Sequence, residues 1–358
     1  MRFDYNIRHR DSLLLLRYPL ERWTYAALAV ALLVAPWALP DYLVGEMTFV
    51  AIMCLAGAGL MVLTGYTGQV SLGHSAFLAV GAYAHALMLG AGVPLPLSLG
   101  LAALLCALLG LVAGIPAIRV HGLYLAMVTL ALAMLVEHLI GRWTSVTGGF
   151  TGLAVPDPSL FGGSLAGLRP FYYLCLFVLV LVLLLLNNLL RAHTGRAFAG
   201  VRDSEAAAAS LGLWVAGYKV LAFVISAAVC GLAGALMAHH VKYLTPEAFG
   251  MQLSLQLVLM VVIGGLGSLR GAVLGAILIN LLPTFVSALK AQLPERLGKQ
   301  FGVDIFVFGL VLAVFVLFEP RGLNGRWLRL KAFVEYFPLY RRDTFKRGKA
   351  YMQSERYR

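Results

Sequence analysis

Apolar residues along this chain fall into long runs that short polar or glycine-rich segments separate. Most runs approach the roughly 20 residues that a helix needs to cross the hydrocarbon core of a bilayer. Ten runs can be drawn, at residues 23–39, 44–63, 71–90, 95–115, 122–140, 171–190, 217–238, 252–264, 271–289 and 303–319. The pattern predicts an all-α, polytopic transmembrane bundle of about ten membrane segments. The third and eighth segments are expected to be broken or interfacial.

The composition excludes a soluble fold. Hydrophobic residues make up 61% of the 358 residues and charged residues only 12%, whereas a soluble domain carries roughly 45–50% apolar and 25% charged residues. The four cysteines lie inside apolar runs without metal-ligand spacing, and they are interpreted as small buried hydrophobic residues.

The positive charges follow the topology that the runs predict. With the N-terminus inside and every run crossing the membrane, 22 of the 28 Lys and Arg residues lie on the cytoplasmic side and six outside, as the positive-inside rule requires. This divides the chain into a basic cytoplasmic N-terminus at 1–22, a permease domain at 23–320 and a basic cytoplasmic tail at 321–358. The net charge of +12 is therefore assigned to topology and to contact with anionic membrane lipid, and no nucleic acid partner is expected.

One polar, glycine-rich stretch between the second and third runs is a candidate for function. A bilayer tolerates irregular polar backbone only where protein or a water-filled cavity covers it. The stretch is therefore either a tight helix connection that hydrogen-bonds across the bundle or a part of the translocation path, and both interpretations stay open. Its candidate path residues are Gly65, Tyr66, Gly68, Gln69, Ser71, Gly73 and His74.

The longest internal polar segment, residues 191–218, is predicted to be a cytoplasmic loop. Asp203 or Ser204 can cap a short helix that runs from Glu205 to Leu211, and Gly212 can end it. A helix this short needs a surface to lie against. It is either an ordinary surface helix or a docking helix for a cytoplasmic partner, with Arg196, Arg202, Asp203, Glu205, Ala206 and Gly212 as its candidate residues.

A second glycine-rich turn contains Gly264, Gly265 and Gly267, which are predicted to allow close helix packing. Leu-Met-Val precedes both turns, and the spacing from it to Gly264 and Gly267 equals the spacing to Gly65 and Gly68. The match indicates either an internal structural repeat or a coincidence in a chain rich in Leu, Val and Gly.

Sequence motifs for catalysis are lacking. The predicted periplasmic loop 142–170 has glycines at 148, 149 and 152 but no Gly-Lys-Ser/Thr ending of a nucleotide-binding loop. No catalytic residue, metal site or cofactor is predicted, and energy for active transport must come from another chain. The apolar runs also lack a convincing set of buried carboxylates, which argues against ion-driven transport.

Three runs carry a resemblance to a known family. GYTGQVSLGHSAFLAVGAYA (65–84), TGRAFAGVRDSEAAAASLGLWVAGYKVLAFVISAAVCGLAGAL (194–236) and VVIGGLGSLRGAVLGA (261–276) occur in this order. Together they resemble the permease subunits of branched-chain amino acid ABC importers, the LivM-type family, over roughly residues 45–320.

The resemblance implies a heteromeric importer in the bacterial inner membrane. A second, LivH-like permease, two ATP-binding subunits that use ATP and magnesium, and a periplasmic solute-binding protein would be the partners. Residues 194–212 then correspond to the ATPase coupling helix region. Phe150 and Thr151 depart from the family's usual loop residues, so urea, short amides and aromatic acids remain alternative substrates. An ion-coupled secondary carrier is the alternative of a different class.

Overall fold

The computed structural model describes residues 19–160, 163–164, 167–290, 309–310, 313 and 322–336. Helices make up most of this part. The longer helices are α2 (Pro19–Ala38), α3 (Asp41–Met61), α4 (His74–Gly90), α5 (Leu95–Ala117), α6 (Leu123–Arg142), α8 (Leu168–Arg191), α9 (His193–Asp203), α11 (Val215–Val241), α12 (Met251–Gly264), α13 (Leu269–Lys290) and α16 (Gly322–Tyr336).

Short elements connect these helices. They are the π-helical turn η1 (Val62–Tyr66), α7 (Thr144–Thr147), the 3₁₀ turns η2 (Gly149–Thr151) and η3 (Pro246–Phe249), α10 (Glu205–Ser210), and the strands β1 (Leu153–Ala154), β2 (Ser159–Leu160), β3 (Gly163–Ser164) and β4 (Tyr243–Leu244). β1 pairs antiparallel with β4, with Leu153 opposite Leu244, and β2 pairs antiparallel with β3.

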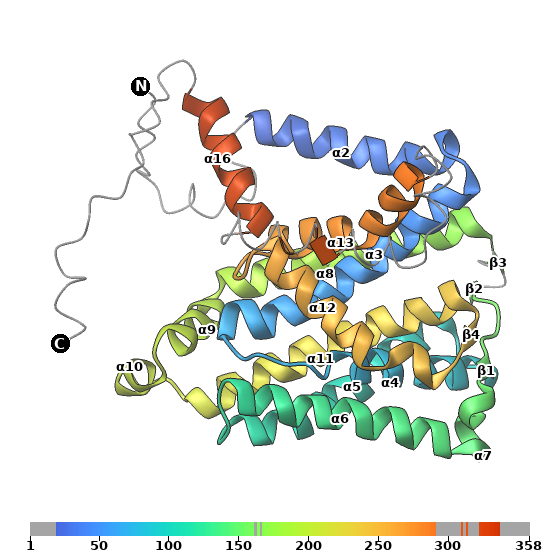
Figure 1. Cartoon of the computed structure of the whole chain (residues 1–358), viewed down its shortest axis with the longest axis horizontal. Coiled ribbons are helices and arrows are strands. Elements are labelled where there is room, and N and C mark those ends of the chain that lie inside the picture. Colours follow the sequence, from blue (N-terminus) through green and yellow to red (C-terminus); the bar gives the residue numbers. More distant parts are fainter. Residues whose placement is uncertain are drawn as a thin grey trace.

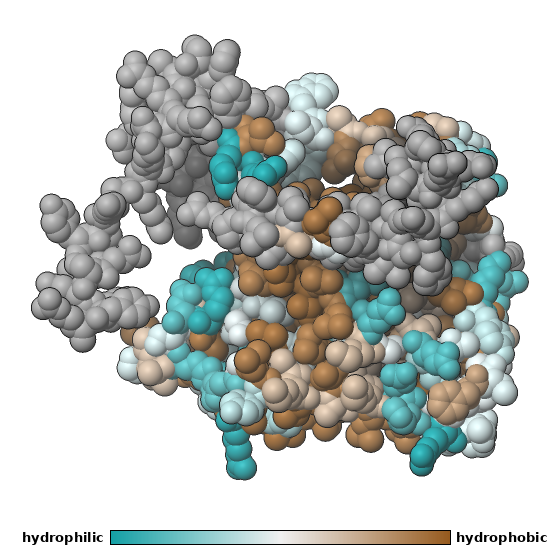
Figure 2. All heavy atoms as spheres, in the orientation of Figure 1, coloured by the Kyte–Doolittle hydropathy of each residue, from teal (hydrophilic) through white to brown (hydrophobic). Residues whose placement is uncertain are grey.

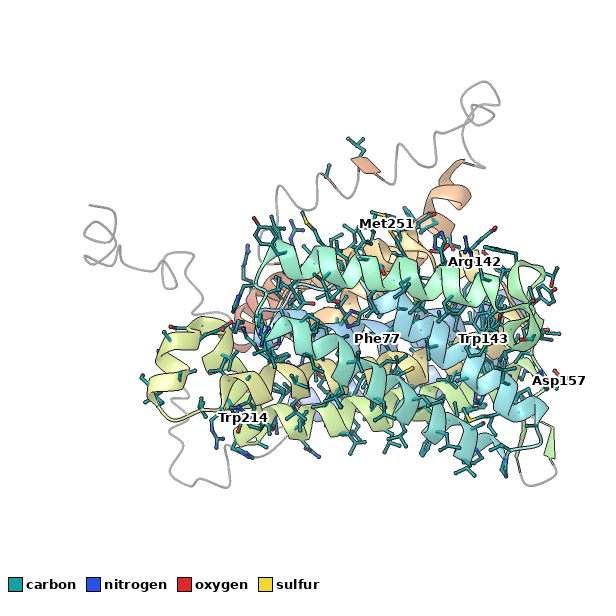
Figure 3. The ribbon with its side chains drawn as sticks, turned by 90° about the horizontal axis from the view of Figure 1, so that it is seen from below. Phe77, Arg142, Trp143, Asp157, Trp214 and Met251 are labelled. Carbon is teal, nitrogen blue, oxygen red and sulfur yellow. The ribbon has the colours of Figure 1, made fainter. Side chains whose placement is uncertain are left out.

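Most of the long helices lie side by side along the long axis of the molecule (Figure 1). The helices α9 and α10 lie at one end of this bundle, which we call the loop-helix end. The strands β1 and β4 and helix α7 lie at the other end, which we call the ribbon end. Figure 3 places Trp214 at the loop-helix end, Trp143 and Asp157 at the ribbon end, and Phe77 between them.

Helix α3 forms the centre of the bundle. From Val50 to Met61 every residue of α3 is buried, so this helix is apolar on all sides, as expected of a core helix. Helix α11 packs most extensively on α5, α4 and α3, and α13 packs on α12 and α3. The most buried part of the molecule is therefore built from segments that lie far apart in the sequence.

The outer helices expose apolar side chains. In α5, Leu104, Leu108 and Val112 are each more than half exposed, and a hydrophobic band covers the middle of the molecule between hydrophilic patches near both ends (Figure 2). A band of this kind is what a bilayer covers in a membrane protein. The chain is thus a multi-pass, all-α membrane protein.

The predicted segments agree with the helices where the structure describes them. Nine of the ten runs coincide with α2, α3, α4, α5, α6, α8, α11, α12 and α13, and the run at 303–319 lies almost wholly outside the described residues. Within the described part, six helical stretches are long and apolar enough to span a membrane, and two shorter apolar helices cover 23–38 and 269–285. The count of ten spans, and the location of the termini, stay predictions.

The third segment begins later than its apolar pattern predicts. The run starts at residue 71, but α4 begins at His74. The reason is that residues 67–73 form an irregular connection between η1 and α4, with Gly68 in the left-handed region at φ 71°. Much of the glycine-rich stretch is therefore turn rather than helix.

Candidate functional site

The helix α3 does not end in a regular α-helical turn. It widens into η1, a π-helical turn at Val62–Tyr66, and such turns occur frequently at functional sites. The hydroxyl of Thr67 donates to the carbonyl of Leu63 at 2.6 Å, and the backbone N–H of Gln69 donates to the same carbonyl at 3.2 Å. These two bonds satisfy the Leu63 carbonyl at the end of the helix, where the regular backbone hydrogen bonding stops.

The polar side chains of the stretch are buried and bonded within the chain. Ser71 Oγ lies 3.0 Å from His74 Nδ1, and His74 Nε2 lies 2.7 Å from Ser226 Oγ on α11. The Ser226 hydroxyl donates in turn to the carbonyl of Gly59 on α3 at 2.7 Å. One hydrogen-bonded chain therefore joins α3, α4 and α11 deep in the bundle.

Gln69 makes a second connection between the stretch and α11. Its amide Nε2 donates to Thr67 Oγ1 at 2.9 Å and to the backbone carbonyl of Lys219 at 3.4 Å. The amide oxygen of Gln69 and the hydroxyl of Thr64 are buried without a hydrogen-bond partner among the described residues. A buried acceptor without a partner costs free energy, so this point of the site is incompletely satisfied.

A glycine is required at position 73 because the turn before α4 approaches helix α6 closely. A Cβ atom at Gly73 would collide with the backbone carbonyl of Thr129 on α6. The same region is bonded through the backbone N–H of Leu72, which donates to Thr129 Oγ1 at 3.0 Å. The turn before α4 is thus held directly against α6.

Arg202 joins the two glycine-rich turns that the sequence singles out. Its guanidinium Nη1 donates to the carbonyl of Gly65 at 3.1 Å. A Cβ atom at Gly68 would lie 3.0 Å from Arg202 Cγ, and one at Gly267 would lie 3.1 Å from Arg202 Nη1. The turns also meet each other, because a Cβ atom at Gly65 would lie 2.7 Å from the backbone nitrogen of Gly267.

Helix α10 is built as its local sequence predicts. Ser204 caps it by accepting from the N–H of Ala207 at 3.3 Å. At its other end Gly212 adopts φ 80°, and the N–H groups of Gly212 and Leu213 donate to the carbonyls of Ala209 and Ala208. This bond pattern is a Schellman motif, which stops the helix after two turns.

Glu205 attaches α10 to the bundle. Its carboxylate lies 2.6 Å from Lys219 Nζ on α11 and 3.2 Å from His121 Nε2 before α6. The side chain of Lys219 is only 3% exposed, whereas that of Glu205 is 40% exposed. Partial burial raises the pKa of the Glu205 carboxyl, but the hydrogen bonds and charges of Lys219 and His121 outweigh burial and hold this pKa below its usual value.

The remaining predicted site residues lie on α9 and α10, in η1 and in the second glycine-rich turn. Arg196 is exposed and donates to the carbonyl of Arg191 at 3.4 Å, and Asp203 pairs with Arg202 at 3.1 Å. Ala206 is exposed on α10 and Tyr66 is half-buried. In the second turn, Gly264 lies against the backbone of Gly271, while Gly265 adopts φ 107° and Gly267 adopts φ 83° to connect α12 with α13.

The residues of the network that were not among the predicted site residues include Lys219, His121 and Ser226. Lys219 was counted only as a topological charge, although a Lys inside an apolar run is itself a signal of function. His121 and Ser226 carry no comparable signal, because their roles depend on partners 84 and 152 residues away.

Comparison with known proteins gives the family. The family model described as "Branched-chain amino acid transport system / permease component" matches residues 42–317. High-affinity branched-chain amino acid transport system permease protein LivM of Escherichia coli (strain K12) is 33% identical over 306 residues, which cover 77% of this chain and 68% of that protein.

More distant relatives include two further kinds of permease. Probable branched-chain amino acid transport permease protein LivH of Methanocaldococcus jannaschii is 24% identical, covering 58% of this chain and 66% of that protein. Autoinducer 2 import system permease protein LsrC of Enterobacter sp. (strain 638) is 32% identical, covering 76% of each chain. No solved structure gives a significant match. The extent of the family match and the identity to LivM place this chain in the family of permease components of branched-chain amino acid transport systems.

Proposed function

We propose that this chain is one of two permease subunits of an ATP-driven importer for branched-chain or related aliphatic amino acids in a bacterial inner membrane. The similarity to both LivM and LivH proteins supports pairing with a second, LivH-like permease. Two partner chains bind and hydrolyse ATP with magnesium at the cytoplasmic face. A periplasmic binding protein delivers the amino acid.

The observation that carries this proposal is the double connection between the α9–α10 loop and the Gly65–His74 stretch. The first connection is the hydrogen bond from Arg202 to the Gly65 carbonyl. The second passes from Glu205 through the Lys219 ammonium, and from the Lys219 carbonyl to Gln69. A displacement of the α9–α10 segment would therefore reach the Gly65–His74 stretch by two routes, one from Arg202 on α9 and one from Glu205 on α10.

The outward side of α10 is suited to a protein partner. Leu211 and Trp214 are 81% and 77% exposed at the loop-helix end, and Ala206 and Ala209 on α10 are exposed with small side chains. A cap, a Schellman motif and the Glu205 contacts hold this short helix in place before any partner arrives. We assign this surface to the ATP-binding subunits, whose motion it passes to the bundle.

In this mechanism the Gly65–His74 stretch moves with the helices that it joins. The hydrogen bonds of Ser71, His74 and Ser226 support a role in tethering α3, α4 and α11. The amino acid passes between the two permeases as these helices reorient, and weak contacts along the path favour release. The buried oxygen of Gln69 has no hydrogen-bond partner among the described residues, so it could bond solute or water once the helices move.

An ion-coupled carrier is less well supported. Coupling to an ion gradient usually requires deeply buried carboxylates. Among the described residues no Asp or Glu side chain is fully buried, and the buried charged residue is Lys219, which pairs with Glu205.

The test is coupled uptake by the reconstituted transporter. Proteoliposomes containing both permeases and both ATP-binding subunits are supplied with binding protein, leucine and internal ATP. Arg202→Ala and Glu205→Arg are expected to lower uptake at least tenfold and to uncouple ATP hydrolysis from leucine, while both proteins remain in the membrane. Arg142→Ala is the control, because Arg142 is exposed at the end of α6, away from the α9–α10 segment.

Two results would overturn the proposal. Unchanged coupled uptake by both the Arg202 and the Glu205 variants would show that the contacts of these two residues do not transmit motion from the ATP-binding subunits. Uptake by the isolated chain, driven by an ion gradient without ATP, would contradict the proposal that this chain is a subunit of an ATP-driven importer.

A further inference from the structure

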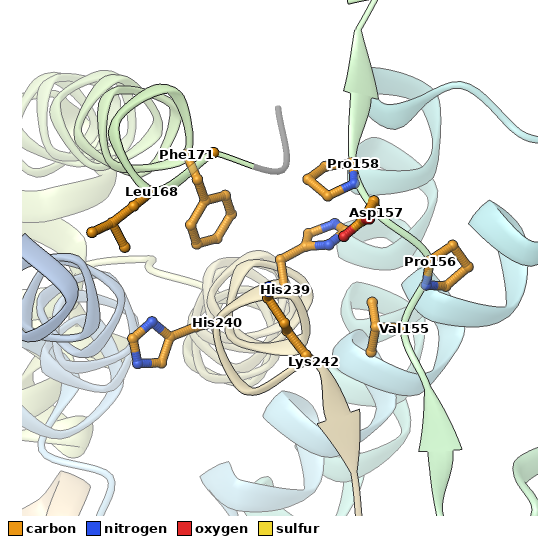
Figure 4. Close-up of a pocket in the computed structure, with 10 residues that line it drawn as sticks. Val155, Pro156, Asp157, Pro158, Leu168, Phe171, His239, His240 and Lys242 are labelled. Atoms are coloured by element: carbon orange, nitrogen blue, oxygen red, sulfur yellow. The ribbon is translucent and has the colours of Figure 1, made fainter. Parts of the chain in front are cut away.

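A pocket of about 140 Å³ opens at the ribbon end of the bundle, opposite the end that carries α9 and α10 (Figure 1). Its walls come from the end of α11, the start of α8 and the segment that follows β1. Figure 4 shows Leu168 and Phe171 on one side of His239, and Asp157 and Pro158 on the other. The pocket therefore has an apolar wall and a polar wall that face each other.

The polar wall carries two opposite charges without ion-pair partners. In the described part of the chain, the carboxylates of Asp203 and Glu205 are paired, but neither Asp157 nor Lys242 makes an ion pair. The imidazole of His239 points toward Asp157 (Figure 4), and His239 lines the pocket together with both charged residues. These charges are thus available to a ligand.

The backbone fixes where these charges lie. Lys242 ends α11 with φ 63°, and among the described residues it is the non-glycine residue with a positive φ. Its carbonyl accepts from the N–H of Val155 at 3.0 Å, next to the β1–β4 pairing. The segment that carries Asp157 is therefore bonded to the residue that supplies the ammonium.

A second histidine, His85, contacts His239 and fixes the orientation of its ring. His239 Nε2 lies 2.8 Å from Nε2 of His85 on α4, and Phe171 packs on the His239 imidazole at a ring separation of 5.8 Å. Because Nε2 is engaged, Nδ1 is the ring nitrogen left for Asp157 or a ligand. The contacts with His85 and Phe171 thereby fix the position of the His239 imidazole on α11.

We propose that this pocket binds the zwitterionic head of a small apolar α-amino acid. Asp157 receives the ammonium group, Lys242 receives the carboxylate, and the hydrocarbon side chain lies against Leu168 and Phe171. The inference rests on the proposed function for the identity of the cargo and adds a site where this chain itself discriminates among solutes. Urea or a short uncharged amide would gain little from two opposite charges, so the pocket favours amino acids over those alternatives.

The test uses the full-length chain in lipid nanodiscs and measures ligand binding by saturation-transfer NMR, which detects weak binding. Three probes separate the charges: leucine, leucinamide, which lacks the carboxylate, and 4-methylpentanoate, which lacks the ammonium group. We expect leucine to bind about tenfold more tightly than either analogue, the scale of one charge-assisted hydrogen bond.

The variants should remove this discrimination selectively. Asp157→Asn is expected to weaken leucine about tenfold and to leave 4-methylpentanoate unchanged, whereas Lys242→Gln is expected to weaken leucine and to leave leucinamide unchanged. Glu247→Gln is the control, because this exposed carboxylate on η3 lies beyond β4 and outside the pocket lining.

The outcomes separate this inference from the proposed function. Absence of leucine binding, or an equal loss for all three probes in both variants, would overturn the assignment of the pocket. Coupled leucine uptake by the reconstituted wild-type complex, measured in parallel, would in that case leave the permease function intact. Failure of that uptake would instead count against the proposed function.

Discussion

The contact between Glu205 and Lys219 leads to an asymmetric prediction. Removing one partner of a buried ion pair typically costs about 3–5 kcal/mol, because the other charge stays buried and unpaired. Glu205→Ala leaves the ammonium of Lys219, which is 3% exposed, in that position. Since the Glu205 side chain is 40% exposed and water screens the pair, we reduce the expected cost to about 1–3 kcal/mol.

The reverse substitution should cost less. Lys219→Met removes the buried charge and keeps the volume of the side chain, and the carboxylate of Glu205 that remains is already partly hydrated and lies beside His121. We expect a cost of about 0–1 kcal/mol. Adding Lys219→Met to Glu205→Ala should therefore recover most of the loss, because no unpaired buried charge remains.

Hydrogen–deuterium exchange measures this cost as opening of α10. The amides of Leu211 and Leu213 bond to carbonyls within α10, so they exchange when this helix detaches or unwinds. A loss of about 1–3 kcal/mol accelerates their exchange about 5- to 150-fold. Amides of the central helix α3 serve as the internal control and should be unaffected.

The relative exchange rates of the α10 amides in the three variants test this reasoning. The reasoning predicts the fastest exchange in Glu205→Ala, and slower exchange in both Lys219→Met and the double variant. If Lys219→Met opens α10 as much as Glu205→Ala does, or if the double variant equals the sum of the single variants, the buried ammonium does not control the attachment of α10.

Three further predictions concern pH, packing and the buried hydrogen-bond chain. The pKa of Glu205 is held below its usual value of 4.5. The contribution of the Glu205 carboxylate to α10 stability is therefore present above pH 4.5 and is lost as the pH falls through the lowered pKa. Exchange of the α10 amides, corrected for intrinsic rates, should accelerate only in that acid range, and the Glu205→Gln variant should lack this acceleration. Gly73→Val should prevent stable folding because its side chain meets the Thr129 carbonyl, whereas Gly90→Ala should be neutral since nothing lies within 4 Å of its Cβ; retention of the chain in detergent, seen by size-exclusion chromatography, distinguishes the two. Ser226→Ala should lower resistance to unfolding in denaturant titrations by about 1–3 kcal/mol because it leaves buried partners unbonded, and a loss no larger than that of Gly90→Ala would contradict the role of this hydroxyl.

Local features of the chain were predictable where the determinants lie within a few residues of each other. A cap at Asp203 or Ser204, a stop at Gly212 and a helix between them follow from short-range hydrogen bonds; the structure confirms the helix and its stop and places the cap at Ser204. The apolar runs likewise predicted nine helices of the described part, with boundaries altered where an irregular turn replaced helix before His74.

Long-range pairings were not predictable, because the sequence does not show which helices are neighbours. The bond from Arg202 to Gly65 joins residues 137 positions apart. Similarly, the sequence marks Lys219 as a Lys inside an apolar run, but only the fold identifies Glu205 as its partner. The prediction that Gln69, Ser71 and His74 line a path stays a prediction, although all three side chains are buried and have partners inside the chain.

The chain from Ser71 through His74 and Ser226 to Gly59 has a consequence for biogenesis. His74 and Ser226 are separated by 152 residues, and a ribosome adding about 5–20 residues per second needs about 8–30 s to bridge that interval. During that time α3 and α4 lack the Ser226 hydroxyl, which bonds His74 and the Gly59 carbonyl in the folded protein. The hydrocarbon core of the membrane offers few other hydrogen-bond partners for these groups. The early helices therefore depend on shelter by the insertion machinery or by neighbouring chains until α11 emerges, and a delay in synthesis between α4 and α11 lengthens the period in which they are vulnerable to degradation.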